Sequence, residues 1–289
     1  MYTLQNEQLE INLSAKGAEI QKIYNKETGL DYLWSGDPAF WGKHSPVLFP
    51  IVGSLKNDSY QYNNQTYHLS RHGFARDMEF SVLAKTDTNI TFSLQQTAAT
   101  LEKYPFYFEL RIHYGIAENR LHVQYEVLNQ DEKTLWFSIG AHPAFKVPLV
   151  KGTNYEDYVL SFNEFENTAR YPLTADGLLA EDPQIFLQNT DELPLKKSLF
   201  YEDALVFKTL QSSSIKLESD KTAHGLTLDF KGFPFMGIWS AKDADFVCIE
   251  PWHGITDSVQ TTGKLEEKEG ILSIGAGDTF TATWTVMTW

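Results

Sequence analysis

Strict alternation of apolar and polar residues recurs along this chain and restricts its fold more than any other feature. Four runs show it most clearly: Leu9–Leu13, Leu121–Val127, Ile215–Glu218 and Thr279–Val286. A period of two is typical of antiparallel strands with one face buried and the other in water. Helical periodicity is scarce, and we expect no more than one turn within Pro38–His44 and another short helix within Leu193–Leu205. Neither segment is long enough for a crossover helix, which argues against a parallel α/β fold.

Turn signals separate the alternating runs, at Lys26–Gly29, Tyr62–Gln65, Ala117–Arg120 and Gly275–Asp278. No Gly/Ser-rich linker, charge block or repeat divides the 289 residues. The segment Pro148–Pro194 carries Asn, Asp and Pro without a regular pattern, so we expect long surface loops there. The sequence therefore predicts an all-β fold, with one large antiparallel domain over residues 1–289 built as a sandwich or distorted barrel.

Charge and cysteine content exclude several classes of partner and cofactor. Lys plus Arg is 24 and Asp plus Glu is 38, so the net charge is 24 − 38 = −14. An acidic surface disfavours nucleic acid and anionic membranes. Cys248 is alone, so we expect neither an intramolecular disulfide nor a zinc site built on cysteines. With no signal-peptide pattern and no run of about 20 apolar residues, we expect a cytoplasmic protein without membrane contact.

A single carboxylate closes an apolar run near the C-terminus. Phe246–Ile249 is typical of a buried strand, and Glu250 follows it directly. Because Pro251 comes next and cannot donate to a ladder, we expect Glu250 at a strand end that a pocket can reach. Burial raises the pKa of a carboxyl group, which suits proton transfer near neutral pH. The residues alone leave a second interpretation open, a structural glutamate paired with an arginine.

Three histidines are further candidates for chemistry. His72 precedes Gly73, which allows a backbone bend or the close approach of a ligand. His142 stands directly before a proline, as Glu250 does. His253 is either a partner of Glu250 or a loop residue. Each histidine taken singly is equally typical of a structural role, in which the imidazole bonds to backbone.

The absence of common metal-binding, nucleotide-binding and nucleophile motifs limits the reactions that this chain is expected to catalyse. No His-x-His or Cys-x-x-Cys metal spacing occurs, and Walker A, Gly-x-Gly-x-x-Gly and Gly-x-Ser-x-Gly patterns are missing. What remains is one imidazole and one carboxylate, His142 and Glu250. Such a pair is suited to general acid/base catalysis without metal, cofactor or covalent nucleophile.

At these residues the chain resembles the aldose 1-epimerase (galactose mutarotase-like) family, and in particular its LacX-like branch. The resemblance is carried by Arg71–Arg76, Gly140–Phe145 and Cys248–Trp252, with further similarity at Phe49–Gly53 and Phe233–Ser240. These segments span nearly the whole chain in the right order. The resemblance implies a β-supersandwich, a large and twisted two-sheet antiparallel domain with few short helices and a sugar cleft on one side.

The resemblance also implies roles for single residues. His142 matches the general acid that protonates the ring oxygen of a pyranose. Glu250 matches the general base that removes the proton of the anomeric hydroxyl. The expected substrate-binding residues are His72, near the ring oxygen, together with Asp203, Arg71, Arg76, Lys56 and Trp239. We expect a small sugar as substrate, no cofactor, and a monomer or homodimer.

One position departs from the family pattern. Many relatives carry an arginine after the glycine of the Gly53 segment, where this chain has Ser54. Either that contact to sugar hydroxyls is lost or Lys56 supplies it from another direction. Related hexose-6-phosphate epimerases hold phosphate with clustered arginines. Because this chain has Arg71 and Arg76, a phosphorylated sugar remains an alternative substrate.

Four functions follow from this reasoning. The leading hypothesis is an aldose 1-epimerase that acts on a free hexose such as galactose or glucose. The others are a hexose-6-phosphate 1-epimerase, a non-catalytic sugar-binding β-sandwich, and a glycoside hydrolase that pairs Glu250 with a second acid such as Asp203.

Overall fold

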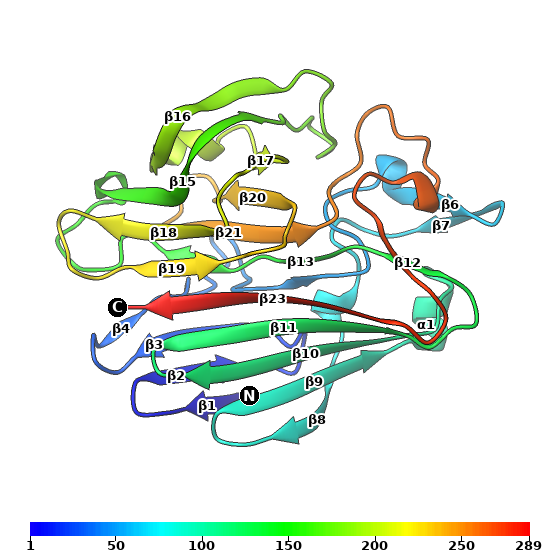
Figure 1. The fold of residues 1–289 in the computed structure, drawn as a ribbon, viewed down its shortest axis with the longest axis horizontal. Helices are drawn as coiled ribbons and strands as arrows, with labels where there is room; N and C mark the ends of the chain where they lie inside the picture. Colours follow the sequence, from blue (N-terminus) through cyan, green and yellow to red (C-terminus); the bar gives the residue numbers. More distant parts are fainter.

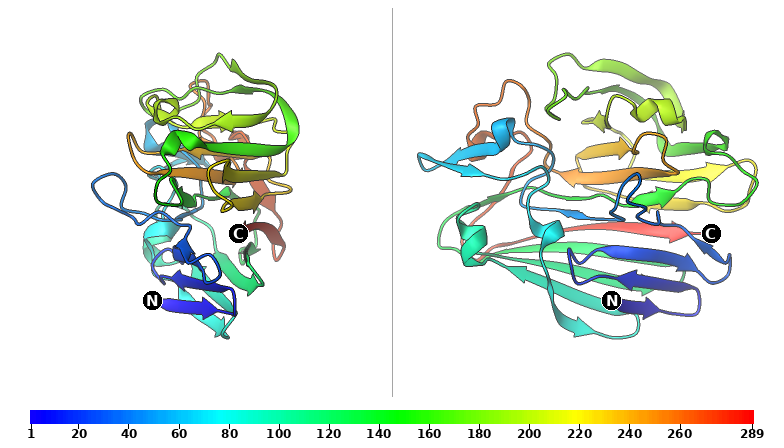
Figure 2. Two further views of the ribbon diagram at one scale, coloured as in Figure 1. Left: turned by 90° about the vertical axis from the view of Figure 1, so that its left-hand side faces the viewer. Right: turned by 180° about the vertical axis from the view of Figure 1, so that it is seen from behind.

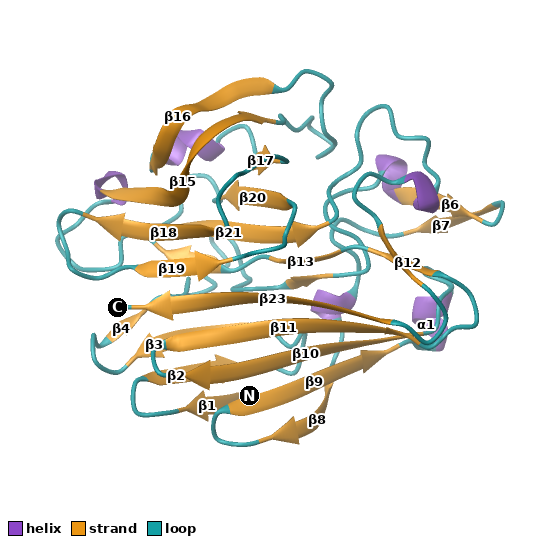
Figure 3. Ribbon diagram, in the orientation of Figure 1, coloured by secondary structure: helices purple, strands orange, loops and turns teal.

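The computed structural model describes residues 1–289 and consists almost entirely of antiparallel strands (Figures 1 and 3). This confirms the predicted all-β class. The largest sheet has nine strands in the order β16 (Gln184–Pro194), β15 (Tyr158–Arg170), β18 (Ser214–Ser219), β19 (Leu226–Asp229), β23 (Thr279–Thr288), β11 (Arg120–Asn129), β10 (Phe108–Ala117), β9 (Asn89–Gln95) and β8 (Ser81–Lys85).

Smaller sheets complete the sandwich. One has six strands, in the order β17 (Leu205–Phe207), β20 (Phe235–Trp239), β21 (Phe246–His253), β13 (Ile139–Ala141) and β5 (Val47–Leu48), with β14 (Ala144–Lys146) paired to β21. Another has four, β1 (Tyr2–Gln5), β2 (Leu9–Leu13), β3 (Ile20–Asn25) and β4 (Leu30–Asp31). The remaining two are the pairs β12 (Leu135–Phe137) with β22 (Leu272–Ile274) and β6 (Ser59–Tyr62) with β7 (Gln65–His68).

Helical structure is limited to single turns. The one α-helix is α1 (Ala98–Leu101), and 3₁₀ turns occur at Lys56–Asp58, Ala75–Asp77, Tyr155–Asp157, Lys197–Phe200 and Leu265–Glu267. The short helix expected within Leu193–Leu205 is therefore present. The single turn expected within Pro38–His44 is also present, because the Phe40 and Trp41 N–H groups both donate to the Asp37 carbonyl. No helix is long and apolar enough to cross a membrane.

Alternation along the strands produces one continuous core. In β11, Leu121, Val123, Tyr125 and Val127 are buried, whereas the residues between them face outward. A single cluster of 62 buried residues includes side chains from the nine-, six- and four-stranded sheets. Strands β1 to β4 lie beside β8 to β11 in every view (Figures 1 and 2). The apolar phase of each strand thus faces the neighbouring sheet.

The loops expected over Pro148–Pro194 are wrong for much of that segment. Strands β15 and β16 form a long antiparallel pair there, at one edge of the nine-stranded sheet. Their register shifts at three places, between Ser161 and Glu166, between Glu166 and Asn167, and between Thr168 and Ala169. Each irregularity breaks the period of two, so the alternation that marks the other strands is lost.

The expected strand end at Pro251 is also wrong, since β21 continues through this proline to His253. On one side of β21, strand β14 pairs with residues up to Cys248 and strand β13 pairs with Trp252 and His253. Between β13 and β14 the neighbouring chain is interrupted at residues 142–143. Pro251, which has no N–H, therefore falls where a gap in the partner strand leaves no hydrogen bond to make.

Candidate active site

A cavity of about 480 Å³ opens over the six-stranded sheet. Seven of the eight expected site residues line it, namely Arg71, His72, Arg76, His142, Asp203, Trp239 and Glu250. They come from strands β20 and β21, from the interruption between β13 and β14, and from loops far apart in the sequence. The fold thus brings the dispersed motifs to one concave site, as is usual for small-molecule sites.

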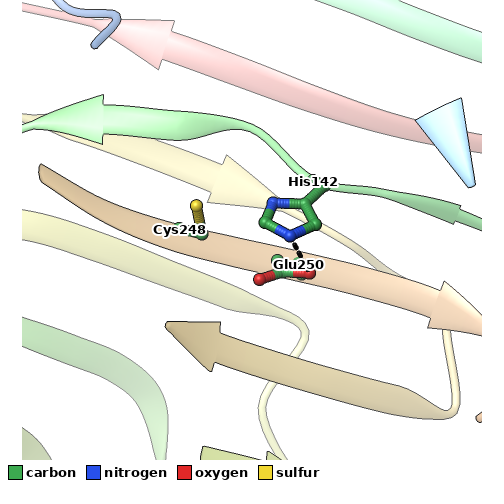
Figure 4. A group of neighbouring side chains, drawn as sticks. All are labelled: His142, Cys248 and Glu250. Atoms are coloured by element: carbon green, nitrogen blue, oxygen red, sulfur yellow. Dashed lines mark ion pairs between the residues drawn. The ribbon is translucent and has the colours of Figure 1, made fainter. Parts of the chain in front are cut away.

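His142 and Glu250 meet at the centre of this cavity. Nε2 of His142 lies 3.3 Å from Oε2 of Glu250, and the two side chains are only 9% and 3% exposed (Figure 4). Glu250 points from β21 toward the gap after β13, where His142 stands. The break in the partner strand is therefore what lets an imidazole reach the carboxylate.

Burial shifts both groups of this pair away from their charged forms. It lowers the pKa of His142 to about 3, and the positive charges of Arg71 and Arg76 act in the same direction. It raises the pKa of Glu250 well above its ordinary value, although Arg71 opposes this shift. A doubly protonated or fully deprotonated pair would leave a net buried charge, so the favoured state holds one proton between the two groups.

Aromatic rings fix the orientation of His142. The indole of Trp41 stacks on the imidazole, with ring centroids 4.9 Å apart and planes 25° apart. Trp239 meets the same imidazole edge-on at 5.7 Å. Trp41 is itself held, because its carbonyl accepts a hydrogen bond from the Trp34 indole. The imidazole is thus confined on two sides by side chains that also line the cavity.

His72 contributes a neutral imidazole beside the pair. Its Nδ1 accepts a hydrogen bond from the Gly53 N–H at 3.1 Å, so a neutral ring carries its proton on Nε2. Burial lowers its pKa well below the ordinary value, and the neighbouring His142 adds to this. His72 has φ 69° and Gly73 φ 70°, and a Cβ on Gly73 would lie 2.3 Å from the Phe49 carbonyl oxygen. Only glycine fits there, and the bend turns His72 inward.

Charged residues stand at the rim. Arg71 Nη2 lies 3.6 Å from Asp203 Oδ1, and both side chains are partly exposed. The Arg76 guanidinium donates to the Arg71 carbonyl and lies 3.7 Å from Asp77 Oδ2. This arrangement presents both hydrogen-bond donors and acceptors to the cavity.

Lys56 is the one expected contact that does not line the cavity. Its ammonium donates to the Val259 carbonyl at 2.8 Å. Ser54 is buried, and its N–H donates to Thr256 Oγ1 while its carbonyl accepts from the Asp257 N–H. The position that holds arginine in many relatives thus joins two loops of the cavity wall here. Lys56 does not replace that arginine.

Sequence reasoning missed several lining residues, of which Trp41 and Trp252 are the largest. Trp252 had a usable signal, since residues two apart on a strand share a face and Trp252 stands two after Glu250. A Cβ on Gly237 would lie 2.3 Å from its ring, and one on Gly140 would lie 2.6 Å away. These two glycines leave the space that the indole fills. Trp41 lies in a turn, where no periodicity pointed to it.

His253 is not a partner of Glu250. It belongs to β21, and its ring lies 4.6 Å from Phe233 and 5.1 Å from Phe280, outside the cavity lining. Burial lowers its pKa to about 4.

Solved structures with the same architecture define the class of fold. The chain superimposes with a TM-score of 0.95 on a galactose mutarotase related enzyme from Lactobacillus acidophilus, at 36% identity, over 100% of this chain and 97% of that one. A galactose mutarotase-like protein from Lactobacillus casei ATCC 334 gives a TM-score of 0.94 at 32% identity, with both chains covered completely. The fold is therefore galactose mutarotase-like.

Sequence comparison then gives the family. The family described as Aldose 1-epimerase matches residues 1–271. The chain is also 39% identical over 287 residues to the chromosomally encoded protein LacX of Lactococcus lactis subsp. lactis, covering 96% of this chain and 95% of that protein. The chain belongs to the aldose 1-epimerase family, which confirms the resemblance seen in its motifs.

Proposed function

We propose that this protein is an aldose 1-epimerase that interconverts the α and β anomers of a hexose. The observation that carries the proposal is the contact of 3.3 Å between His142 and Glu250 inside a cavity. Opening a cyclic hemiacetal needs one proton delivered to the ring oxygen and one removed from the anomeric hydroxyl. A buried pair that holds one proton supplies both steps.

The reaction conserves protons at the pair. When the shared proton lies on His142 Nε2, Glu250 takes the proton of the anomeric hydroxyl and His142 gives its proton to the ring oxygen. The bond between C1 and the ring oxygen breaks, and a carbonyl forms at C1. After rotation about the C1–C2 bond, the same groups act in reverse and close the ring on the other face. Throughout, the pair holds one proton or passes it through the sugar, so no net charge is buried.

The surrounding residues suit a pyranose. The Nε2–H of His72 is a donor next to the pair, and Arg71 with Asp203 presents a donor and an acceptor at the rim. Trp41, Trp239 and Trp252 supply aromatic surface for the apolar C–H face of the ring.

Polarimetry of a freshly dissolved α-anomer tests the proposal. We expect purified protein to accelerate the approach to anomeric equilibrium well above the spontaneous rate with glucose or galactose. No acceleration with any common aldose contradicts the proposal. Sugar binding without acceleration would support the non-catalytic sandwich, and release of reducing sugar from aryl glycosides would support the hydrolase.

A phosphorylated hexose is a second candidate substrate. It is favoured by the two guanidinium groups of Arg71 and Arg76, which both line the cavity. Acceleration with glucose 6-phosphate but not with glucose selects this alternative.

A further inference from the structure

The catalytic pair has a third neighbour that the proposed reaction does not use. Cys248 stands two residues before Glu250 on β21, so both side chains point from the same face of the strand (Figure 4). One donor atom each from Cys248, His142 and Glu250 lies within 4.8 Å of the other two. In Figure 4 the sulfur lies on the side of the imidazole that carries Nδ1, and the carboxylate lies at Nε2.

We propose that His142, Glu250 and Cys248 form a binding site for a thiophilic divalent cation such as Zn²⁺, and that the bound ion inhibits the enzyme. Inhibition rests on the proposed function, because the ion would occupy the groups that move protons. Binding itself does not depend on that function.

The donor set selects the kind of ion. Zn²⁺ takes sulfur, nitrogen and carboxylate oxygen ligands at about 2.0–2.3 Å, and three protein ligands with one open position are typical of accessible zinc sites. A donor spacing of at most 4.8 Å is close to what such bond lengths span, so small side-chain rotations suffice. Mg²⁺ and Ca²⁺ prefer oxygen ligands and are disfavoured by a thiolate and an imidazole.

Burial is compatible with this ion. A dication with one thiolate, one carboxylate and a neutral imidazole carries no net charge, so a buried complex avoids the cost of an unpaired ion. Coordination expels two protons, one from the thiol and one from the His142–Glu250 pair. Cys248 is fully buried in an apolar cluster with Trp34, Ala144 and Phe246. His142 and Glu250 line the cavity, and an ion entering there reaches the thiol beside them.

A buried imidazole nitrogen without a hydrogen-bond partner supports the presence of a ligand at this place. Nδ1 of His142 has no hydrogen-bond partner in the protein, and the side chain is only 9% exposed. A buried nitrogen without a partner is rare, because it forfeits the hydrogen bond it would make in water.

Spectroscopy with Co²⁺ in place of Zn²⁺ tests binding. Because Cys248 is the only cysteine, a near-ultraviolet sulfur-to-cobalt charge-transfer band can arise from this site alone. We expect the band in the wild-type protein, its loss in Cys248→Ala, and its retention in His113→Gln, which removes a histidine of the outer sheet face. Absence of the band from the wild-type protein overturns the proposal, whether or not the protein proves to be a mutarotase.

Inhibition is measured on the same variants. We expect Zn²⁺ to slow mutarotation, a chelator to restore it, and Mg²⁺ to have no effect. Cys248→Ala should raise the half-inhibiting Zn²⁺ concentration more than about tenfold. Removing a residue that only supports a metal ligand already lowers metal affinity by about that factor, and Cys248 is proposed as a ligand itself. Equal sensitivity of wild type and Cys248→Ala overturns the proposal. If Cys248→Ala does not fold, Cys248→Val replaces it, and the cobalt band of the wild type still decides.

Discussion

Two histidine–glutamate contacts of similar length occur in this molecule, in opposite surroundings. In the cavity, His142 and Glu250 are 3.3 Å apart with 9% and 3% of their side chains exposed. On the outer face of the nine-stranded sheet, His113 and Glu126 are 3.0 Å apart with 33% and 23% exposed. The distance between donor and acceptor is thus a poor guide to function. The two pairs differ instead in how far their side chains are exposed to water.

Both side chains of the outer pair have further polar partners. His113 Nδ1 lies 3.0 Å from Thr91 Oγ1, and Arg111 Nη1 lies 3.5 Å from Glu126 Oε2. Such cross-strand contacts belong to the solvated face of the sheet and stabilise it weakly. In the cavity, Nδ1 of His142 has no hydrogen-bond partner, and burial raises the pKa of Glu250 well above its ordinary value even though Arg71 and Trp252 act against this rise. The dominant effect of burial is what makes that pair suitable for proton transfer.

Removing the carboxylate from each pair is the strongest test of this comparison. Glu250→Gln should lower kcat for mutarotation by roughly 10²- to 10⁴-fold, the usual contribution of a general base, while the similar shape keeps sugar binding. Glu126→Gln is the matched control and should leave kcat within about twofold, since any general acid/base contribution requires contact with the substrate. Polarimetry gives both rates. Equal losses in the two variants contradict the distinction.

His253 tests whether burial without an acidic partner shifts a histidine in the same direction as in the cavity. Its pKa of about 4 in the folded protein lies below the ordinary 6.5, so only the unfolded chain takes up a proton between these values. The free energy of unfolding should therefore decrease as the pH falls from 6.5 to 4. Below pH 4, His253 should cause no further decrease. In His253→Gln, which cannot titrate, this loss should shrink by about 1–3 kcal/mol. Urea unfolding at several pH values measures it. An unchanged slope contradicts the assigned burial effect.

Aromatic stacking is a second difference, because Trp41 covers His142 and no ring covers His113. Trp41→Leu should lower kcat about two- to tenfold, the value of an aromatic contact of about 0.5–1.5 kcal/mol that holds the imidazole in place. Phe40→Leu, at the exposed neighbour in the same turn, serves as control and should keep the wild-type rate. A rise in KM with unchanged kcat would instead assign Trp41 to sugar binding alone.

The smallest expected effect concerns the outer pair. Glu126→Gln should lower the free energy of unfolding by about 0.2–1 kcal/mol at low salt, as for other exposed ion pairs. The difference from wild type should shrink in about 1 M NaCl because salt screens exposed charges. Chemical denaturation gives both values. A loss that salt leaves unchanged would mean that this pair is as secluded as the one in the cavity.

Prediction from the sequence succeeded where a local pattern determines the structure. The alternation in β11 gave its buried face, and Asn63 and Asn64 adopt the positive φ values of a tight hairpin turn. Prediction failed for β15 and β16, because register irregularities destroy the pattern on which it depends. It also failed at Pro251, where the gap that tolerates a proline lies in another strand.

The candidate site shows the same division. Motifs named seven of the 14 lining residues, but the meeting of His142 with Glu250 depends on how β13, β14 and β21 pair. That pairing involves segments far apart in the chain, which a single sequence does not specify. Trp41 was missed for a similar reason, since a turn residue gains its place from contacts such as the Trp34 indole bond. Lys56 was predicted to line the site because it is close to Ser54 in the sequence, but this proximity does not bring it to the cavity.

The two glycines beside Trp252 have a consequence for molecular recognition. The indole fits because Gly140 and Gly237 carry no side chain, so its place is set by neighbouring strand backbones rather than by mobile loops. A rigid floor of this kind is already ordered before a ligand arrives, and association then loses little conformational entropy there. Under the proposed function, selectivity among sugars is left to the rim, where Arg71 and Asp203 remain partly in contact with water and can be exchanged without rebuilding the sheet.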